Sequence, residues 1–131
     1  MSIIQSALSQ EALGVKTVVL DIDCDSSVAV NDLVYQDLIV SEEVYKSTNN
    51  THLPKIFGIC IQKYTSTRCR VLCMGVVSGY TDLIKGKFIF WGTSGEITST
   101  KPSDGFLHIL GFAISATKIY FSPNNIRVLQ S

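Results

Sequence analysis

The sequence predicts a single all-β domain, a compact β-sandwich or barrel of about ten short strands. Short apolar runs separated by Gly, Pro, Asn and Ser follow one another along the chain, and no segment after Gly14 keeps the 3.6-residue period of a helix. The 131 residues are 46% hydrophobic and only 17% charged. This composition provides enough apolar surface for one folded core and excludes disorder over most of the chain.

The first element, residues 1–16, is predicted to be an N-terminal arm, followed by a single β-domain over 17–131. Ile3, Ile4 and Leu8 share one face of a short helical turn in this segment. The arm has no basic region and no continuous apolar stretch, so we expect neither a signal peptide nor a membrane-spanning helix.

The first part of the β-domain is predicted to hold five strands and one long polar loop. Asp21 and Asp23 alternate with apolar residues in the first of these strands, and Arg68 and Arg70 share one face of the last. Gly58 interrupts the fourth strand. The strands are expected at 18–24, 32–35, 38–40, 56–64 and 68–74, and the polar loop at 46–54.

The second part is predicted to begin with a hairpin, since the turn Gly92–Gly95 separates the strand 88–91 from the strand 96–98. A loop follows at 101–105. The remaining strands are expected at 106–114, 119–121 and 127–129.

The two parts resemble each other and indicate an internal repeat, roughly over 28–74 and 82–129. A glycine stands at the same place in both copies, Gly58 and Gly111, and predicts a bulge or bend that lets a strand curve. Chance similarity among β-rich segments is the alternative. The matched segments are 32–35 with 87–90, 56–61 with 109–114, and 70–72 with 127–129.

Charge is distributed unevenly although the net charge is zero. Residues 1–43 carry eight acids and one base, whereas residues 44–131 carry ten bases and three acids. This asymmetry predicts that the acidic segment lies against a basic surface, either of its own chain or of a neighbouring subunit. The bases are dispersed and form no cluster, so nucleic acid is not an expected partner.

The four cysteines, Cys24, Cys60, Cys69 and Cys73, are predicted to be reduced thiols in the core. Cys60 and Cys73 stand between apolar neighbours, and the chain has no CxxC pair. A disulfide or a zinc site are the alternatives, and the two isolated histidines make zinc ligation less favourable. Reduced thiols fit a protein that is assembled in a cytoplasm.

Asp21, Asp23 and Asp25, followed by Asp32, have the spacing of oxygen ligands in a calcium loop. Ser26 stands where the sharp turn of such a loop needs glycine, and Asp32 stands where a bidentate Glu is usual. The alternative is a strand whose acids face solvent or a basic neighbour. We therefore expect no metal site.

No motif predicts catalysis. Gly86-Lys87 lacks the Ser or Thr and the earlier Gly of a phosphate-binding loop, and Gly92–Glu96 departs from a nucleophile elbow. A triad of Ser94, His108 and Asp104 has no supporting spacing. The sequence therefore predicts neither an enzyme nor a bound cofactor.

Residues 79–123 carry a pattern of turn and core residues that resembles a small β-domain of tailed-bacteriophage virion proteins. The pattern is similar to the module of capsid decoration, or cement, proteins and of some tail-fibre and tail-tip proteins, and it covers about a third of the chain. The residues that carry it are Gly79-Tyr80, Leu83, Gly86, Phe88-Ile89-Phe90, Ser94–Thr98, Pro102–Gly105, Leu110-Gly111, Ala113–Ser115, Ile119, Phe121 and Pro123.

The resemblance implies a bacteriophage structural protein that binds the major capsid protein on the outer capsid surface and stabilises the shell. It also implies a homotrimer, located in the virion and assembled in the host cytoplasm, without nucleic-acid or membrane partners. The protein would stabilise the shell by burying apolar area against several capsid subunits, and the arm would add a strand to exposed sheet edges. The expected capsid or inter-subunit contacts are Ile3, Ile4, Leu8, Asp21, Asp23, Asp25, Lys63, Arg68 and Arg70.

The alternative function is a tail-fibre or tail-tip component that binds a host receptor or glycan. Trp91, Tyr80 and Tyr120 are the aromatic residues that could stack on sugars, although a buried core position is the expected one for Trp91.

Overall fold

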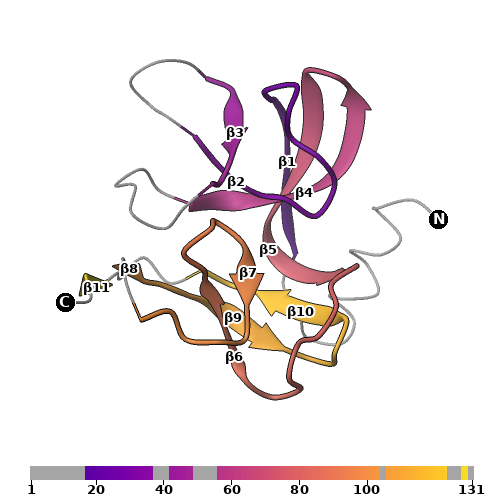
Figure 1. Ribbon diagram of the computed structural model, residues 1–131. Coiled ribbons are helices and arrows are strands. Elements are labelled where there is room, and N and C mark those ends of the chain that lie inside the picture. Colours follow the sequence, from indigo (N-terminus) through magenta and orange to yellow (C-terminus); the bar gives the residue numbers. More distant parts are fainter. Residues whose placement is uncertain (1–16, 37–41, 49–55, 104–105, 124–127, 130–131) are drawn as a thin grey trace.

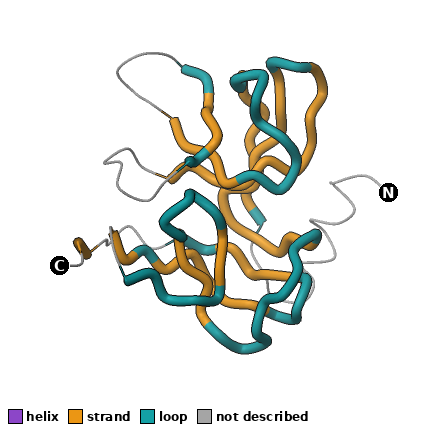
Figure 2. Tube along the Cα trace, viewed as in Figure 1, coloured by secondary structure: helices purple, strands orange, loops and turns teal. Residues whose placement is uncertain are grey.

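The structure is a computed structural model that describes residues 17–36, 42–48, 56–103, 106–123 and 128–129. This part of the chain contains strands and loops and no helix (Figure 2), which confirms the all-β class and leaves no helix long and apolar enough to cross a membrane. The strands are β1 (Val18–Asp23), β2 (Leu33–Gln36), β3 (Val44–Lys46), β4 (Ile56–Thr65), β5 (Arg68–Ser78), β6 (Phe88–Trp91), β7 (Ile97–Thr98), β8 (Phe106–Leu107), β9 (Ile109–Ala113), β10 (Lys118–Phe121) and β11 (Val128–Leu129).

Nine strands form one curled antiparallel sheet in the order β3-β2-β4-β5-β10-β9-β6-β7, with β1 also paired to β5. The long strand β5 joins two halves (Figure 1). Its residues 68–74 pair with β1 and β4, and its residues 75–78 pair with β10. We call β1 to β4 with residues 68–74 the first half, and residues 75–78 with β6, β7, β9 and β10 the second half.

The strand pairing of the first half repeats in the second half. Strands β3, β2 and β4 pair with one another in the same order as β7, β6 and β9. The two sets lie on opposite sides of the central β5–β10 pair, so β4 corresponds to β9, β2 to β6 and β3 to β7. The register agrees residue by residue, as shown by Leu33↔Ile59 and Val34↔Gly58 in one half and Phe88↔Phe112 and Ile89↔Gly111 in the other.

The bulge expected from the shared glycine lies at the same place in both halves. The register shifts directly after the residue opposite Gly58 and directly after the residue opposite Gly111. A Cβ atom on Gly58 would lie 2.3 Å from the carbonyl oxygen of Leu72, and one on Gly111 would lie 1.9 Å from that of Tyr120. Both strands therefore need glycine where a neighbouring backbone approaches.

One sequence match of the predicted repeat is wrong. Ile59 of the first half corresponds to Phe112 of the second half. Ile59 pairs with Leu72 of β5, whereas Phe112 pairs with Tyr120 of β10. The counterpart of β5 is therefore β10. Residues 128–129, which the sequence matched to 71–72, form β11 and pair with β8 in a separate two-stranded sheet. Similar side chains led to that match, whereas hydrogen-bond register defines the repeat.

The main core lies between the two halves. Leu33, Ile59 and Leu72 of the first half pack against a layer of apolar side chains from the second half. The residues of the second half in this core are Leu83, Ile89, Trp91, Leu110, Ala113, Ile119 and Phe121. Burial of this apolar surface holds the halves together as one domain.

A second core fills the opposite side of the first half. Val34, Cys60 and Val71 point into it, and the segment that follows β1 covers it with Cys24 and Val28. A bridge between Cys24 and Val44 closes the curled sheet at this point, with the amide of Asp25 donating to the carbonyl of Val44 at 2.9 Å. Both faces of β2 and β4 therefore carry buried side chains.

Three predictions differ from the structure, and two predicted elements lie outside the described residues. The single strand predicted at 106–114 is divided, since Phe106–Leu107 form β8 and pair with β11, whereas Ile109–Ala113 form β9 and pair with β6 and β10. Strand β3 begins at Val44, where the sequence predicts no strand, and β5 continues past the predicted end at Met74 to Ser78. Strand β3 pairs with β2, and residues 75–78 of β5 pair with β10. Such long-range contacts override the local preference of the sequence. The predicted arm 1–16 and the predicted strand 38–40 lie outside the described residues.

Candidate functional site

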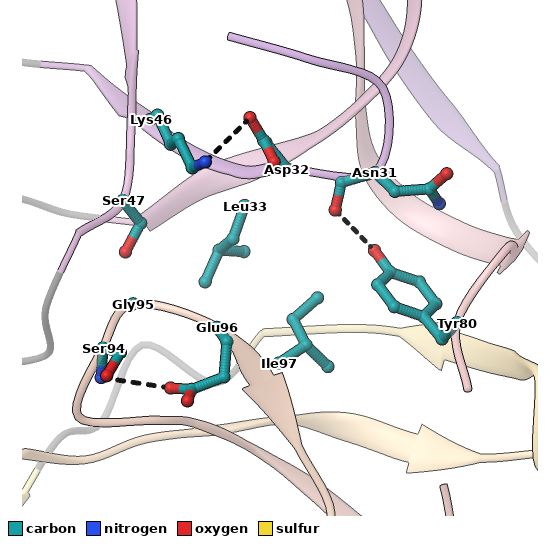
Figure 3. A pocket seen from close by; sticks show the side chains of 10 residues that line it. All are labelled: Asn31, Asp32, Leu33, Lys46, Ser47, Tyr80, Ser94, Gly95, Glu96 and Ile97. Carbon is teal, nitrogen blue, oxygen red and sulfur yellow. Dashed lines mark hydrogen bonds and ion pairs between the residues drawn. The ribbon is translucent and has the colours of Figure 1, made fainter. Parts of the chain in front are cut away.

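A cleft of about 320 Å³ opens between the two halves (Figure 3). The start of β2, the end of β3 and the segment that precedes β2 form its upper wall, and the β6–β7 turn forms its lower wall. The open end of the β2–β3 hairpin therefore faces the turn of the equivalent β6–β7 hairpin. The lining residues are Asn31, Asp32, Leu33, Lys46, Ser47, Tyr80, Ser94, Gly95, Glu96 and Ile97.

The polar groups of this cleft bind one another. Lys46 Nζ lies 3.9 Å from Asp32 Oδ2, and the Tyr80 hydroxyl donates to the carbonyl oxygen of Asn31 at 3.1 Å. Burial raises the pKa of Tyr80, so this hydroxyl remains a donor at neutral pH. Glu96 Oε1 accepts from the amide of Ser94 at 3.1 Å. The cleft presents no nucleophile hydrogen-bonded to a base among the described residues, so its geometry offers no catalytic pair.

The cleft ends at a contact between the halves. Trp91 Nε1 donates to Ser47 Oγ at 2.8 Å, and both side chains are buried. A Cβ atom on Gly95 would lie 2.4 Å from the carbonyl oxygen of Ser47, so the β6–β7 turn is pressed against the end of β3. Trp91 is 1% exposed and is a core residue, as expected, and it cannot stack on a ligand in this conformation.

The predicted contact residues Asp21, Asp23, Arg68 and Arg70 form a ladder of cross-strand ion pairs. Asp21 pairs with Arg70 at 2.7 Å and Asp23 pairs with Arg68 at 2.9 Å, because β1 and β5 are antiparallel neighbours. The hydrogen bond from Arg70 lowers the pKa of Asp21, and a bond from Tyr64 acts in the same direction. These acids of the N-terminal segment thus have bases of their own chain as partners.

Asp25 and Lys63 hold the turn that follows β1. Asp25 Oδ2 accepts from the amide and hydroxyl of Ser27, and these bonds lower the pKa of Asp25. Lys63 Nζ donates to the carbonyl oxygen of Val28 at 2.6 Å. Asp32 instead caps a different turn, where it accepts from the amide of Ala29 at 2.8 Å. The described residues contain no group of three or more His, Cys, Asp or Glu arranged to hold a metal ion.

The four cysteines are free thiols in the structure; three are buried and Cys73 is half-buried. Cys24, Cys60 and Cys69 lie together in the second core and are fully buried. Burial raises the pKa of Cys69 to about 12, and it also raises those of Cys60 and Cys73. A raised pKa favours the protonated form of these three thiols at neutral pH.

Exposed aromatic side chains lie on the outer side of the second half. Phe88 is 59% exposed and Phe112 is 43% exposed, and the two face each other across β6 and β9. Phe112 also packs against Tyr120 of β10, with ring centroids 5.5 Å apart. We call Phe88, Phe90, Phe112 and Tyr120 the aromatic face. Contiguous apolar patches of this kind mark interaction sites on soluble proteins.

A groove of about 430 Å³ lies at one end of the aromatic face. Phe88, Phe90 and Ile84 form its apolar wall, and Ile84 is 52% exposed. Lys87 and Lys101 line the same groove, together with Ser99 and Thr100. The groove thus combines an apolar surface with positive charge.

Sequence reasoning missed the aromatic face as a functional surface. The signal was present in the alternation of Phe88, Ile89, Phe90 and Trp91, which places the first and third residues on one side of the strand and the second and fourth on the other. All four residues are apolar, so the pattern does not tell which side is covered. Ile3, Ile4 and Leu8 of the predicted contact set lie outside the described residues.

Comparison of the chain with family models, with curated proteins and with solved structures finds no match. What the protein does is therefore inferred from its residues and their arrangement.

Proposed function

We propose that this protein is a structural component of a bacteriophage virion, a decoration protein that binds the outer surface of the capsid and stabilises the shell. The observation that carries this proposal is the aromatic face, because an exposed apolar sheet surface serves a protein that binds another protein. The residues that carry the resemblance to phage virion proteins lie mainly in the second half, which bears this face.

The proposed mechanism is non-covalent. Phe88 and Phe112 would lose their contact with water on the capsid surface, and the free energy of that burial would hold subunits of the shell together. The major capsid protein is the proposed partner, and a homotrimer is the proposed assembly, which sedimentation equilibrium measures directly.

The test is binding to shells assembled from the capsid protein of the same genome without this chain. Wild type is expected to bind, and the double variant Phe88→Ser/Phe112→Ser is expected to bind at least tenfold more weakly, because both side chains are exposed and central to the patch. Val30→Ser, which changes an apolar residue that is 50% exposed in the first half, is the matched control. No binding of wild type to these shells would overturn the proposal.

The predicted contribution of the arm is tested separately. Deletion of residues 1–14 leaves the described strands intact, and it is expected to abolish shell binding if the arm adds a strand to the capsid protein. Circular dichroism of the shortened chain reports whether the β-domain still folds. Unchanged affinity would exclude the arm from the contact while leaving the aromatic face in place.

The second candidate, a tail component that binds a host receptor or glycan, is favoured by the polar cleft. Asp32, Lys46 and Glu96 place hydrogen-bonding groups on facing walls of a 320 Å³ space, which suits a hydroxylated ligand. A glycan array distinguishes the two functions. Binding to one saccharide that is lost in Glu96→Gln would favour the tail component over the decoration protein.

A further inference from the structure

The two faces of the repeated sheet exchange roles between the halves. In the first half, Leu33, Ile59 and Leu72 lie on the face that packs against the second half. The residues at the same register positions in the second half are Phe88, Phe112 and Tyr120, which form the aromatic face. The aromatic face is therefore the repeat-related copy of a surface that already binds a β-layer inside this molecule.

The opposite faces correspond in the same way. Val34, Cys60 and Val71 of the first half point into the second core, whereas their counterparts Ile89, Ala113 and Ile119 point into the main core. The halves are thus stacked front to back, like neighbouring units of a repeat protein. At one end of this stack Cys24 and Val28 cover the sheet, and at the other end no described segment plays that part, so Phe88 and Phe112 are exposed.

We propose that the aromatic face binds an apolar β-layer of a partner protein, one that carries carboxylates where it meets Lys87, Lys101 and Lys118. The inference rests on the proposed function, since it names the partner chemistry of the same face. The partner layer would occupy the place that the second half occupies on the first half, and an apolar side chain would fill the groove beside Phe88 and Ile84.

Charge argues for the acidic rim. Lys87 and Lys101 line the groove, and Lys118 shares the outer side of β10 with Tyr120 because the two residues are two positions apart. All three lysines are exposed. The salt bridges among the described residues all lie in the first half. Lys87, Lys101 and Lys118 therefore form no salt bridge with an acidic side chain of the described residues. Complementary carboxylates on a partner would select it and fix its register.

Two other occupants fit less well. Among the described residues, a second copy of this chain offers no free counterpart of the docked face, because Cys24 and Val28 cover that face. Two aromatic faces brought together would also place lysine against lysine. Single-stranded nucleic acid needs ring faces open for stacking, whereas Phe112 and Tyr120 are tilted by 48° and pack on each other.

Site-specific photocrosslinking in cells that assemble the particle tests this inference. p-Benzoylphenylalanine replaces Phe88 or Phe112 in the full-length chain, and Val30, exposed in the first half, is the control position. We expect positions 88 and 112 to crosslink to the same partner protein. The crosslinked segment of that partner should be a strand with alternating apolar residues and with Asp or Glu nearby. The yield should fall at least tenfold in Lys87→Glu/Lys101→Glu and persist in Lys87→Arg/Lys101→Arg.

Every result decides between the inference and its alternatives. Crosslinking to a second copy, to nucleic acid or to helical segments would overturn it, as would equal yields from position 30. The failures are distinguishable. If positions 88 and 112 reach an acidic β-layer of a non-virion protein, the inference stands and the virion function fails. If the chain binds shells and Phe88→Ser/Phe112→Ser does not weaken that binding, the function stands and the inference fails.

Discussion

The two halves share one pairing pattern but bury different surfaces. Ile59 is fully buried between the halves, whereas Phe112 at the equivalent position is 43% exposed. The first half has an additional strand, β1, and a following segment that covers its other face, and no described strand plays that part for the second half. The difference shows that register alone does not determine burial. What packs on each face determines it.

The largest expected effect comes from the glycines that both halves share. Gly111→Ala places a Cβ atom against the carbonyl oxygen of Tyr120 and forces alanine into a φ of 138°, so we expect a loss of about 3 kcal/mol or more. Gly58→Ala meets the carbonyl of Leu72 without a positive φ and should cost less. Urea unfolding followed by fluorescence measures both, and a fully stable Gly111→Ala would contradict the repeated bulge.

The equivalent positions 59 and 112 sharpen the comparison. Ile59→Ala leaves a cavity in the main core, and we expect it to lower the free energy of unfolding by about 3 kcal/mol. Phe112→Ala removes a half-exposed ring and should lower it by less than about 1 kcal/mol. Chemical denaturation of the two variants provides the measurement. Similar losses for both would show that the aromatic face is covered in solution.

The hydrogen bond between Trp91 and Ser47, which joins the halves at the end of the cleft, is expected to contribute less to the free energy of unfolding. Ser47→Ala removes the acceptor of the Trp91 indole N–H in a buried site, and we expect a loss of about 1–2 kcal/mol. Ser94→Ala is the matched control, because this exposed serine lines the same cleft. Thermal unfolding followed at the tryptophan signal reports on both. If the two variants melted together, the buried bond would contribute nothing.

The smallest effect is expected at the surface ladder of the first half. The pKa of Asp21 is lowered in the folded state, chiefly by the bond from Arg70, so this pair stabilises the protein above the usual value of 3.8. That contribution disappears as the pH falls through the lowered pKa. The difference in melting temperature between wild type and Asp21→Asn should therefore be small at pH 6 and shrink further as the pH falls below 3.8. A difference that grows on acidification would have the wrong sign.

Local pattern was enough to predict the class of fold and several site features. Alternation in 68–74 placed Arg68 and Arg70 together, and the glycines at 58 and 111 predicted the bulges. The charge asymmetry suggested an acidic segment against basic residues, and it left open whether those residues belong to the same chain. The ion pairs of Asp21 and Asp23 show that, for these two acids, the basic residues belong to the same chain. The sequence spacing could not predict this, because the pairing of β1 with β5 is a long-range contact.

The sequence by itself determined that this chain forms strands, where its turns and bulges lie, and that its cysteines suit a core. These properties depend on residue type and on a period of two, which are local. Only the tertiary structure decided that β5 joins two equivalent halves and that Phe88 and Phe112 remain exposed. Both sides of strand β6 are apolar, so the packing of one half on the other selects which side meets water.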